Sequence, residues 1–158
     1  MRASVVAAIL AAAAAGCATD NYMEPSGSGT ASLRIENQGP PIFGYELAAY
    51  AYEDATTCRG RLLIAGALKR GVMHRVRVAA DAPFTFTLKA AGGGAARGDA
   101  CTLAGSFVPR AGERYVAVFR AEERKCEVLF VRQQATPSGA RRNVDEPTYR
   151  PRHESACL

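Results

Sequence analysis

Between residues 31 and 132, apolar and polar side chains alternate in short runs. The clearest run covers residues 83–90, where three large apolar side chains alternate with three polar ones: Phe84, Phe86 and Leu88 with Thr85, Thr87 and Lys89. Successive side chains of a β-strand point to opposite faces, so this period of two is typical of a strand with one buried face. We therefore predict a strand with the two phenylalanines and the leucine inward, and the threonines and the lysine outward.

Similar runs recur along this region, separated by turns rich in Gly, Pro and charged residues. They predict strands at 31–37, 42–52, 61–65, 72–79, 83–90, 100–108, 114–121 and 125–131. No segment shows a helical period of any length. Short strands spaced about 8–12 residues apart, in a region of about 100 residues, predict an all-β fold: a single antiparallel β-sandwich, immunoglobulin-like or transthyretin-like.

Two details of the strand pattern bear on topology. The turns at 109–113 and 122–124 are short enough for hairpins, so the last three strands are expected to form an antiparallel meander. In the run 42–52, the large side chains change from one face of the strand to the other. Either both faces of that strand are covered, or a β-bulge near Ala48 re-aims the side chains.

The beginning of the chain is predicted to be an export signal. Arg2 precedes an unbroken apolar run, Val5 to Ala15, which is too short to span a bilayer and is typical of a secretory signal peptide. The ending Ala14-Ala15-Gly16-Cys17 resembles the bacterial lipobox, at which signal peptidase II cleaves before a cysteine that carries a diacylglycerol. The resemblance implies lipidation of Cys17. By resemblance to the lipoprotein sorting rule, Ala18 in place of aspartate implies the outer membrane. An ordinary secretory signal followed by a chance cysteine is the alternative.

Polar segments flank the alternating region on both sides. Residues 18–30 are rich in Gly, Ser, Pro, Asp and Asn, which is typical of a flexible tether. Residues 133–158 are polar, contain three prolines and show no alternation, so we expect a largely irregular tail. The chain is thus divided into a signal peptide, a lipidated tether, a β-sandwich domain and a polar tail: residues 1–16, 17–30, 31–132 and 133–158.

The chain has five cysteines, and lipidation of Cys17 leaves an even set for disulfides in an oxidising compartment. Cys101 begins the first strand of the expected meander and Cys126 begins the third, so both lie at one end of the predicted sheet. We predict a Cys101–Cys126 disulfide and therefore a Cys58–Cys157 disulfide, which ties the tail back to the sandwich. A bridge between molecules or a free thiol are the alternatives for Cys157.

The formal net charge is +5 at pH 7. A basic balance suggests nucleic acid as a partner only where a protein meets it, and an exported, lipid-anchored chain is expected to bind none. Anionic lipid headgroups, lipopolysaccharide and peptidoglycan are the acidic partners within reach. The tail arginines Arg141, Arg142, Arg150 and Arg152 form either part of a fixed surface, if the tail is tied back, or a mobile basic arm. A basic surface that only keeps the protein soluble is the other interpretation.

Few residues are suited to catalysis. Of the two histidines, His74 lies on the apolar face of a predicted strand, and His153 precedes Cys157 by four residues without two further ligands. The sequence contains no Gly-x-Ser-x-Gly nucleophile motif, and no Gly-Lys-Ser/Thr follows Gly92–Gly94 to make a phosphate loop. We therefore expect no catalytic residue, no metal and no cofactor.

Aromatic side chains allow two interpretations. A sandwich core without tryptophan needs other large aromatics, and this role is expected for Tyr45, Tyr50, Tyr52 and Tyr115. The alternative is an aromatic surface on which a sugar or a peptide stacks.

The chain also resembles small proteobacterial envelope lipoproteins, over Phe107-Val108-Pro109, Gly112, Tyr115 to Phe119 and Cys126. This resemblance implies a non-catalytic structural or interaction module, held by lipid at the outer membrane on its periplasmic face or at the cell surface. A partner is expected among envelope proteins or anionic envelope polymers. Alternatives are a protein that binds or hydrolyses peptidoglycan or sugar, or a hydrolase inhibitor that uses the loop 91–99.

Overall fold

The computed structural model describes residues 20–39, 46–91, 100–122, 125–152 and 157, and it is all-β in these ranges. The strands are β1 (Asp20–Asn21), β2 (Thr30–Gln38), β3 (Glu46–Asp54), β4 (Arg59–Leu68), β5 (Met73–Ala79), β6 (Phe84–Ala91), β7 (Cys101–Phe107), β8 (Arg114–Glu122), β9 (Lys125–Ala135), β10 (Arg141–Asp145) and β11 (Arg150–Arg152).

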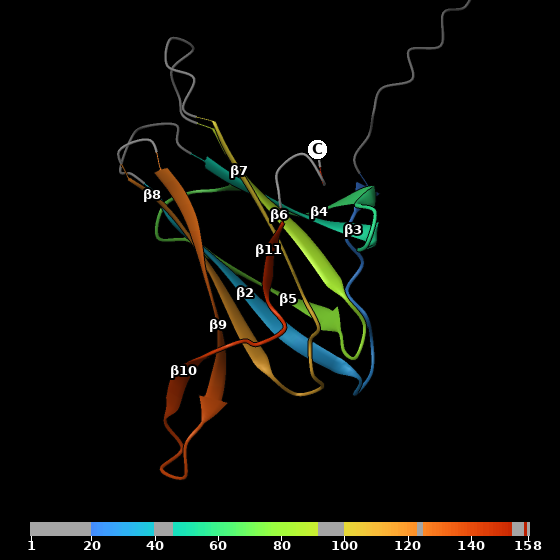
Figure 1. The fold of residues 1–158 in the computed structure, drawn as a ribbon, viewed down its shortest axis with the longest axis vertical. Helices are drawn as coiled ribbons and strands as arrows, with labels where there is room; N and C mark the ends of the chain where they lie inside the picture. The colour runs from blue at the N-terminus through green and yellow to red at the C-terminus, as the bar shows by residue number, and fades with distance from the viewer. Residues whose placement is uncertain (1–19, 40–45, 92–99, 123–124, 153–156, 158) are drawn as a thin grey trace, which may run out of the picture.

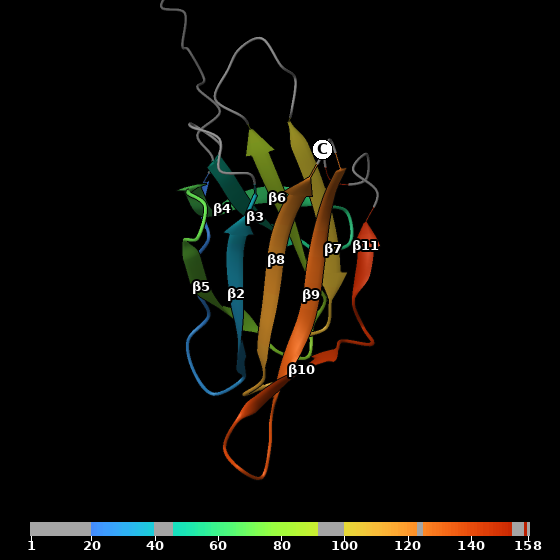
Figure 2. The same ribbon diagram turned by 90° about the vertical axis from the view of Figure 1, so that its left-hand side faces the viewer.

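These strands form two sheets that pack face to face (Figures 1 and 2). The first sheet has the order β1-β4-β3-β6-β7-β11, and the second has the order β10-β9-β8-β2-β5. The expected β-sandwich is therefore present. Its sheets are mixed rather than purely antiparallel, because β1 pairs parallel with β4 and β2 pairs parallel with β8.

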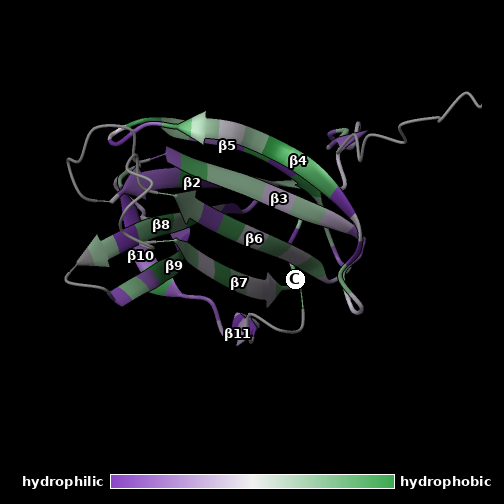
Figure 3. Ribbon diagram, turned by 90° about the horizontal axis from the view of Figure 1, so that it is seen from above, coloured by the Kyte–Doolittle hydropathy of each residue, from purple (hydrophilic) through white to green (hydrophobic). Residues whose placement is uncertain are grey.

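The core lies between the two sheets and follows the alternation of the sequence. The largest side chains that are almost fully excluded from solvent come from both layers: Leu33, Ile35, Tyr115 and Phe119 from the second sheet, and Leu47, Phe86, Leu88 and Phe107 from the first. Seen from above in Figure 3, β4 is hydrophobic over most of its length, after a hydrophilic beginning. Phe84, Phe86 and Leu88 are all buried in this core, so the inward face predicted for residues 83–90 is confirmed.

The prediction that β7 and β8 form a hairpin is wrong. β7 pairs with β6 and β11 in the first sheet, whereas β8 pairs with β9 and β2 in the second. The turn 109–113 crosses from one layer to the other, so the rings of Phe107 and Tyr115 face each other across the core with centroids 4.8 Å apart. The β8–β9 hairpin, in contrast, is present.

The irregularity expected near Ala48 lies mainly in the neighbouring strand. Between Leu47 and Ala49 the β4 partner moves from Leu68 to Ala65, and between Ala49 and Tyr50 it moves on to Leu63, so each step leaves one extra residue on β4. β3 itself keeps its alternation and pairs regularly with β6. Near the end of β3 both faces are covered, because Tyr52, on the face opposite Leu47, is also buried.

The expected tether is not free along its described length. Asp20 and Asn21 form β1 against Leu62 and Leu63, and the next residue, Tyr22, packs against the core. The ring of Tyr22 meets Phe84 edge-on, with centroids 6.0 Å apart, and its hydroxyl donates to the carbonyl of Arg77 at 3.1 Å. Residues 20–22 therefore close the side of the sandwich that is bordered by β4 in the first sheet and by β5 in the second.

The expected irregular tail is also incorrect over its described part, which forms β10 and β11 and lengthens β9 to Ala135. Between β10 and β11, the ring of Tyr149 enters the opposite side of the sandwich and stacks on Phe130 with centroids 4.5 Å apart. Each of the two open sides is thus closed by one tyrosine from a segment whose composition is otherwise polar.

The outward face of β6 is a further correction. Thr85 and Thr87 were expected to be exposed, yet both are buried. Thr85 donates to the carbonyl of Ala55 at 2.6 Å, and Thr87 lies 2.8 Å from the hydroxyl of Tyr52. The β3–β4 turn and Cys157 cover this face of β6. Cys157 is buried against Tyr52 in a second, small apolar cluster. Lys89 is exposed, as expected.

Candidate functional site

The proposed lipidation residue, Cys17, lies outside the described residues, as do His153, Tyr45, most of the loop 91–99 and residues 123–124. The first described residue, Asp20, already pairs with β4, and the parallel register sets it beside Leu62. Cys58 lies next to the start of β4. The chain therefore enters the sandwich at the end of β4 that carries the Cys58–Cys157 disulfide.

Two disulfides are present, Cys58–Cys157 and Cys101–Cys126, with Cα–Cα distances of 5.0 and 6.3 Å. The pairing agrees with the sequence prediction, but the geometry of the second differs from the reasoning behind it. Cys101 begins β7 in the first sheet and Cys126 lies in β9 in the second, so this bridge joins the two layers instead of two strands of one sheet. The first bridge fixes Cys157 over the outer face of the first sheet.

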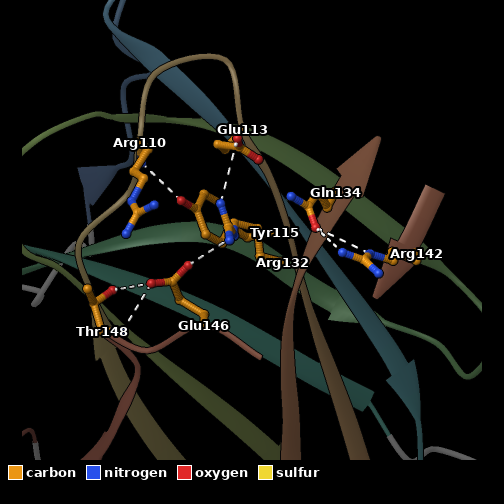
Figure 4. A network of polar contacts seen from close by, with 8 residues as sticks. All are labelled: Arg110, Glu113, Tyr115, Arg132, Gln134, Arg142, Glu146 and Thr148. Atoms are coloured by element: carbon orange, nitrogen blue, oxygen red, sulfur yellow. Dashed lines mark hydrogen bonds and ion pairs between the residues drawn. The ribbon is translucent and has the colours of Figure 1, made fainter. Parts of the chain in front are cut away.

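A polar network closes the side of the sandwich that Tyr149 enters (Figure 4). The fully buried carboxylate of Glu146 accepts hydrogen bonds from the backbone N–H of Thr148, at 3.0 Å, and from its hydroxyl, at 2.7 Å. Its other oxygen lies 3.5 Å from Nε of Arg132, whose guanidinium also lies 3.7 Å from Glu113. These contacts fasten the β10–β11 connection to β9 and to the 109–113 turn.

Tyr115 lies beside this network, and its hydroxyl accepts a hydrogen bond from the backbone N–H of Arg110 at 3.0 Å. Burial raises the pKa of Tyr115, and the nearby carboxylates of Glu146 and Glu113 raise it further. Nε of Arg132 and the second carboxylate oxygen of Glu146 are buried and form an ion pair without a hydrogen bond, and the ring of Tyr115 belongs to the core. The network therefore joins the β10–β11 connection to the core and to the 109–113 turn.

An arginine cluster on the outer face of the second sheet is the strongest candidate for binding. The cluster comprises Arg34 on β2, Arg75 and Arg77 on β5, and Arg114 on β8. The strand register makes these residues neighbours, because Arg34 lies directly opposite Arg75, and Ser32 lies between Arg77 and Arg114. All four positions alternate with buried ones, such as Val76 and Tyr115, so they point away from the core.

Two carboxylates partly neutralise the arginine cluster. Arg34 pairs with Glu36 at 2.9 Å, and Arg77 pairs with Glu24 at 2.9 Å, a contact that lowers the pKa of Glu24 through the hydrogen bond from Arg77. Among the described residues, Arg75 and Arg114 have no such partner. Like charges directly opposite each other on neighbouring strands are destabilising. Because Glu36 and Glu24 compensate two members of the cluster, Arg75 and Arg114 carry the charges that are left for an added anion.

The sequence pattern alone did not identify the arginine cluster. The outward positions of individual strands were visible, since Arg75 and Arg77 alternate with valines. The strand order β8-β2-β5 brings Arg34 and Arg114 beside them. In this order β2 and β8, which are far apart in the chain, form a parallel pair. No short-range signal in the sequence specifies that order.

An open depression of about 710 Å³ lies at one end of the second sheet, lined by Asn37, Gln38, Arg70, Gly71, Arg120 and Glu127. The amide of Asn37 is already used, since it donates to the carbonyl of Leu68 at 2.7 Å and accepts from Gly39 at 2.9 Å. Arg120 lies between Gln38, at 3.3 Å, and Glu127, at 3.9 Å. Most of the polar side chains here thus contact one another or the backbone, whereas Arg70 has no ion-pair partner among the described residues.

The remaining candidates from the sequence are placed as follows. His74 lies on β5, partly buried, and no group of three or more His, Cys, Asp or Glu residues able to hold a metal ion occurs within the described ranges. Tyr52 and Tyr115 are buried, so they do not form an aromatic surface. Tyr50 is partly exposed, with the guanidinium of Arg61 5.0 Å above its ring. Over the same part of the chain, no helix is long and apolar enough to cross a membrane.

Comparison of the chain with protein-family models finds no match, and comparison with curated proteins finds none either. The function is therefore argued from the residues themselves.

Proposed function

We propose that this chain is a lipid-anchored lipoprotein of the bacterial outer membrane, facing the periplasm, that acts as a non-catalytic interaction module and binds an anionic envelope polymer through the arginine cluster. The observation that carries the binding part is the juxtaposition of Arg34 and Arg75, with Arg77 and Arg114 on either side of Ser32. Guanidinium groups bind phosphate and carboxylate oxygens in a bidentate manner, and repeated anionic groups of a polymer suit a cluster spread over three strands.

The anchoring part rests on the lipobox resemblance of Ala14 to Cys17. Two disulfides support an oxidising compartment, where such bonds persist. Because Asp20 is already paired in β1, Cys17 precedes the folded domain by only three positions. A lipid on Cys17 would therefore hold the sandwich close to the membrane, by the end of β4 near Cys58. This arrangement differs from a domain on a long flexible tether.

The absence of catalysis in this proposal is supported by the state of the buried polar groups. The buried carboxylate of Glu146 is engaged by Thr148 and Arg132, and the buried hydroxyl of Tyr52 is engaged by Thr87 and Cys157. Neither lines the depression at the end of the second sheet. The interaction module is therefore favoured over an envelope hydrolase.

Anchoring is tested with the Cys17→Ser variant expressed in a Gram-negative host. We expect the parent protein to incorporate labelled palmitate and to fractionate with outer membranes, and the variant to do neither. A Cys58→Ser variant serves as control, because it removes a disulfide cysteine and leaves the lipobox intact. Retention of Cys17→Ser in washed outer membranes would refute the anchored part of the proposal.

Binding is tested by co-sedimentation of the folded protein with purified lipopolysaccharide in one arm and with peptidoglycan in the other. The two arms distinguish phosphate-rich from carboxylate-rich polymer. We expect the double variant Arg75→Ala/Arg114→Ala to lose most of the binding, and added salt to weaken the parent's binding, because exposed charges are screened. Lys89→Ala removes an exposed charge on the other sheet and should bind like the parent. Equal binding by the parent and the double variant would exclude the arginine cluster as the binding surface.

The free energy of unfolding gives an independent test of the role of the arginine cluster. Arg75→Ala removes one member of a like-charged cross-strand pair, so it should leave the free energy of unfolding unchanged or raise it by about 0.2–1 kcal/mol. If Arg75 instead stabilised the fold, Arg75→Ala would lower the free energy of unfolding. Loss of binding without loss of stability is therefore the expected signature of Arg75.

A further inference from the structure

The strand β10 is an edge of the second sheet, and it belongs to a hairpin with β9 that projects beyond the rest of the sandwich (Figures 1 and 2). β10 pairs antiparallel with β9, with Arg142 opposite Gln134 and Val144 opposite Arg132. On its other side, no described strand pairs with it. An edge strand with unpaired backbone groups is a template for pairing with another strand.

The hydrogen-bonding pattern identifies which backbone groups of β10 are unpaired. At the end of the hairpin, the backbone N–H of Thr136 donates to the carbonyl of Ala140 at 2.8 Å. Hydrogen-bonded pairs alternate along an antiparallel ladder, so Arg142 and Val144 direct their backbone groups toward β9. Arg141, Asn143 and Asp145 direct theirs outward. Their side chains are exposed and lie on one face of the sheet, opposite the face of Val144.

These three residues are complementary to a second copy of themselves. An antiparallel pair centred on Asn143 sets Arg141 of each copy opposite Asp145 of the other, and Asn143 opposite Asn143. The outward-directed backbone groups then meet one another, giving two N–H···O bonds at each of the three opposed pairs. The two Arg–Asp pairs place opposite charges side by side across the new strand pair. Among the described residues, neither Arg141 nor Asp145 has an ion-pair partner within its own chain.

The other long edge of the second sheet, β5, has the opposite character. Self-pairing of β5 centred on Arg75 would set that residue against its own copy. The carbonyl of Arg77 already accepts from Tyr22. Like charges on an edge strand discourage edge-to-edge association. Of the two edges of this sheet, only β10 is thus suited to a partner of the same sequence.

We propose that two copies of this chain associate through β10, in an antiparallel pair with a two-fold axis at Asn143, so that the second sheets of both copies become one continuous sheet. Such an interface is isologous, because the same surface is used twice. A strand of five residues buries far less than the roughly 1,200 Å² of a stable standard interface, so the dimer is reversible and concentration-dependent. A two-fold axis perpendicular to the sheet places the arginine clusters of both copies on the same side.

The association is tested by sedimentation velocity of the oxidised full chain carrying Cys17→Ser, from micromolar to millimolar concentration. We expect the weight-average sedimentation coefficient to rise with concentration. Arg141→Asp and Asp145→Arg should each weaken association about tenfold or more, since two attractive pairs become repulsive. A mixture of these two variants should associate again, because both cross-strand pairs of the mixed dimer then join an acidic side chain to a basic one. A parent chain that stays monomeric, or a mixture no more associated than its components, would overturn the proposal.

Two further variants locate the interface without changing the charge of β10. Asn143→Pro removes an outward N–H, which an edge strand tolerates, and should abolish association while leaving the melting temperature close to that of the parent. Lys89→Asp makes the same charge change on β6, in the other sheet, and should associate like the parent. In hydrogen exchange, the amides of Arg141, Asn143 and Asp145 should slow with rising concentration. Persistent association of Asn143→Pro would place the interface elsewhere and exclude β10.

Discussion

Tyr149 lies so close to Gly105 that a Cβ atom at position 105 would approach Cε2 of the tyrosine ring to 2.5 Å and its hydroxyl oxygen to 2.9 Å. The ring therefore occupies the space that any larger residue on β7 would fill. On its other side, it stacks on Phe130, and Phe86 is also within stacking distance. Gly105 is the residue that lets the β10–β11 connection close this side of the sandwich.

Gly105→Ala should displace Tyr149 and loosen the β10–β11 connection. Overpacking of this kind costs about 1–3 kcal/mol, which chemical denaturation would measure. Limited proteolysis should cut the variant after β10 sooner than the parent. Gly66→Ala is the matched control, because only one side-chain atom, 3.9 Å away, would meet the added methyl. Equal stability of the two variants would mean that Tyr149 does not need this space.

Thr87 and Lys89 lie on the same face of β6 and differ in what covers them. Thr87 is 4% exposed and bonded to Tyr52, whereas Lys89 is exposed. Thr87→Ala should cost about 1–3 kcal/mol, because it leaves the buried hydroxyl of Tyr52 with one partner fewer. Lys89→Ala should change the free energy of unfolding by less than about 0.5 kcal/mol. On the inner face, Phe86→Ala should cost about 3–5 kcal/mol. A melting temperature of Thr87→Ala equal to that of Lys89→Ala would contradict the covering of this face.

Glu146 is predicted to stabilise the tail through its hydrogen bonds more than through its charge. Glu146→Ala leaves the N–H and the hydroxyl of Thr148 without their acceptor and should cost about 1–3 kcal/mol. Glu146→Gln keeps an acceptor for the hydroxyl of Thr148 and should cost clearly less. Equilibrium denaturation of both variants, compared with Glu127→Gln as an exposed control, measures the difference. Equal losses for Ala and Gln would show that the charge on Arg132 is what requires Glu146.

Tyr22 is predicted to make the fold sensitive to alkaline pH. Burial, with a smaller contribution from Glu24, raises the pKa of Tyr22 to about 12 from its ordinary value of 10.0. Because its pKa is raised in the folded state, Tyr22 makes its full contribution to the free energy of unfolding below about pH 10. This contribution falls as the pH rises toward 12, since the unfolded chain loses the proton first. The fall should be shallower in Tyr22→Phe, although this variant loses the bond to Arg77 and starts about 1 kcal/mol less stable. Unfolding curves at pH 8 and pH 11.5 compare the two, and parallel losses would exclude a contribution of Tyr22.

The strands and their inward faces could be predicted from the sequence because alternation of apolar and polar residues is a local signal. Leu33, Ile35, Phe84 and Phe86 stand in regular runs, and each is buried as its run indicated. Tyr22 is a single aromatic residue in a polar segment, and so is Tyr149. One large side chain without a periodic neighbourhood gives no pattern, so the sealing of the two open sides was not predictable from composition.

Connections between layers were not predictable for a related reason. The length of the 109–113 turn suits a hairpin as well as a crossing between sheets, and the choice depends on whether Phe107 and Tyr115 pack side by side or face to face. The arginine cluster depends on the same kind of information, because Arg34 and Arg114 become neighbours only through the parallel β2–β8 pair. The cysteine pairing could be predicted because it depends on which end of its strand each cysteine occupies. That position varies less between topologies than the strand order does.

The two disulfides are nested: the span closed by Cys58 and Cys157, 99 residues apart, encloses the Cys101–Cys126 bridge. If Cys17 is acylated, a chain that emerges amino-terminus first presents Cys58 and then Cys101 to an oxidant before Cys157 arrives. Joining cysteines in order of arrival would therefore give a Cys58–Cys101 bond, which must be undone by thiol–disulfide exchange. We expect acid-quenched peptide maps of early oxidation to contain that bond and a disulfide isomerase to shorten its lifetime, whereas direct appearance of the native pairs would contradict this order. Maturation of the sandwich then depends on the reshuffling capacity of its compartment as well as on its oxidising power.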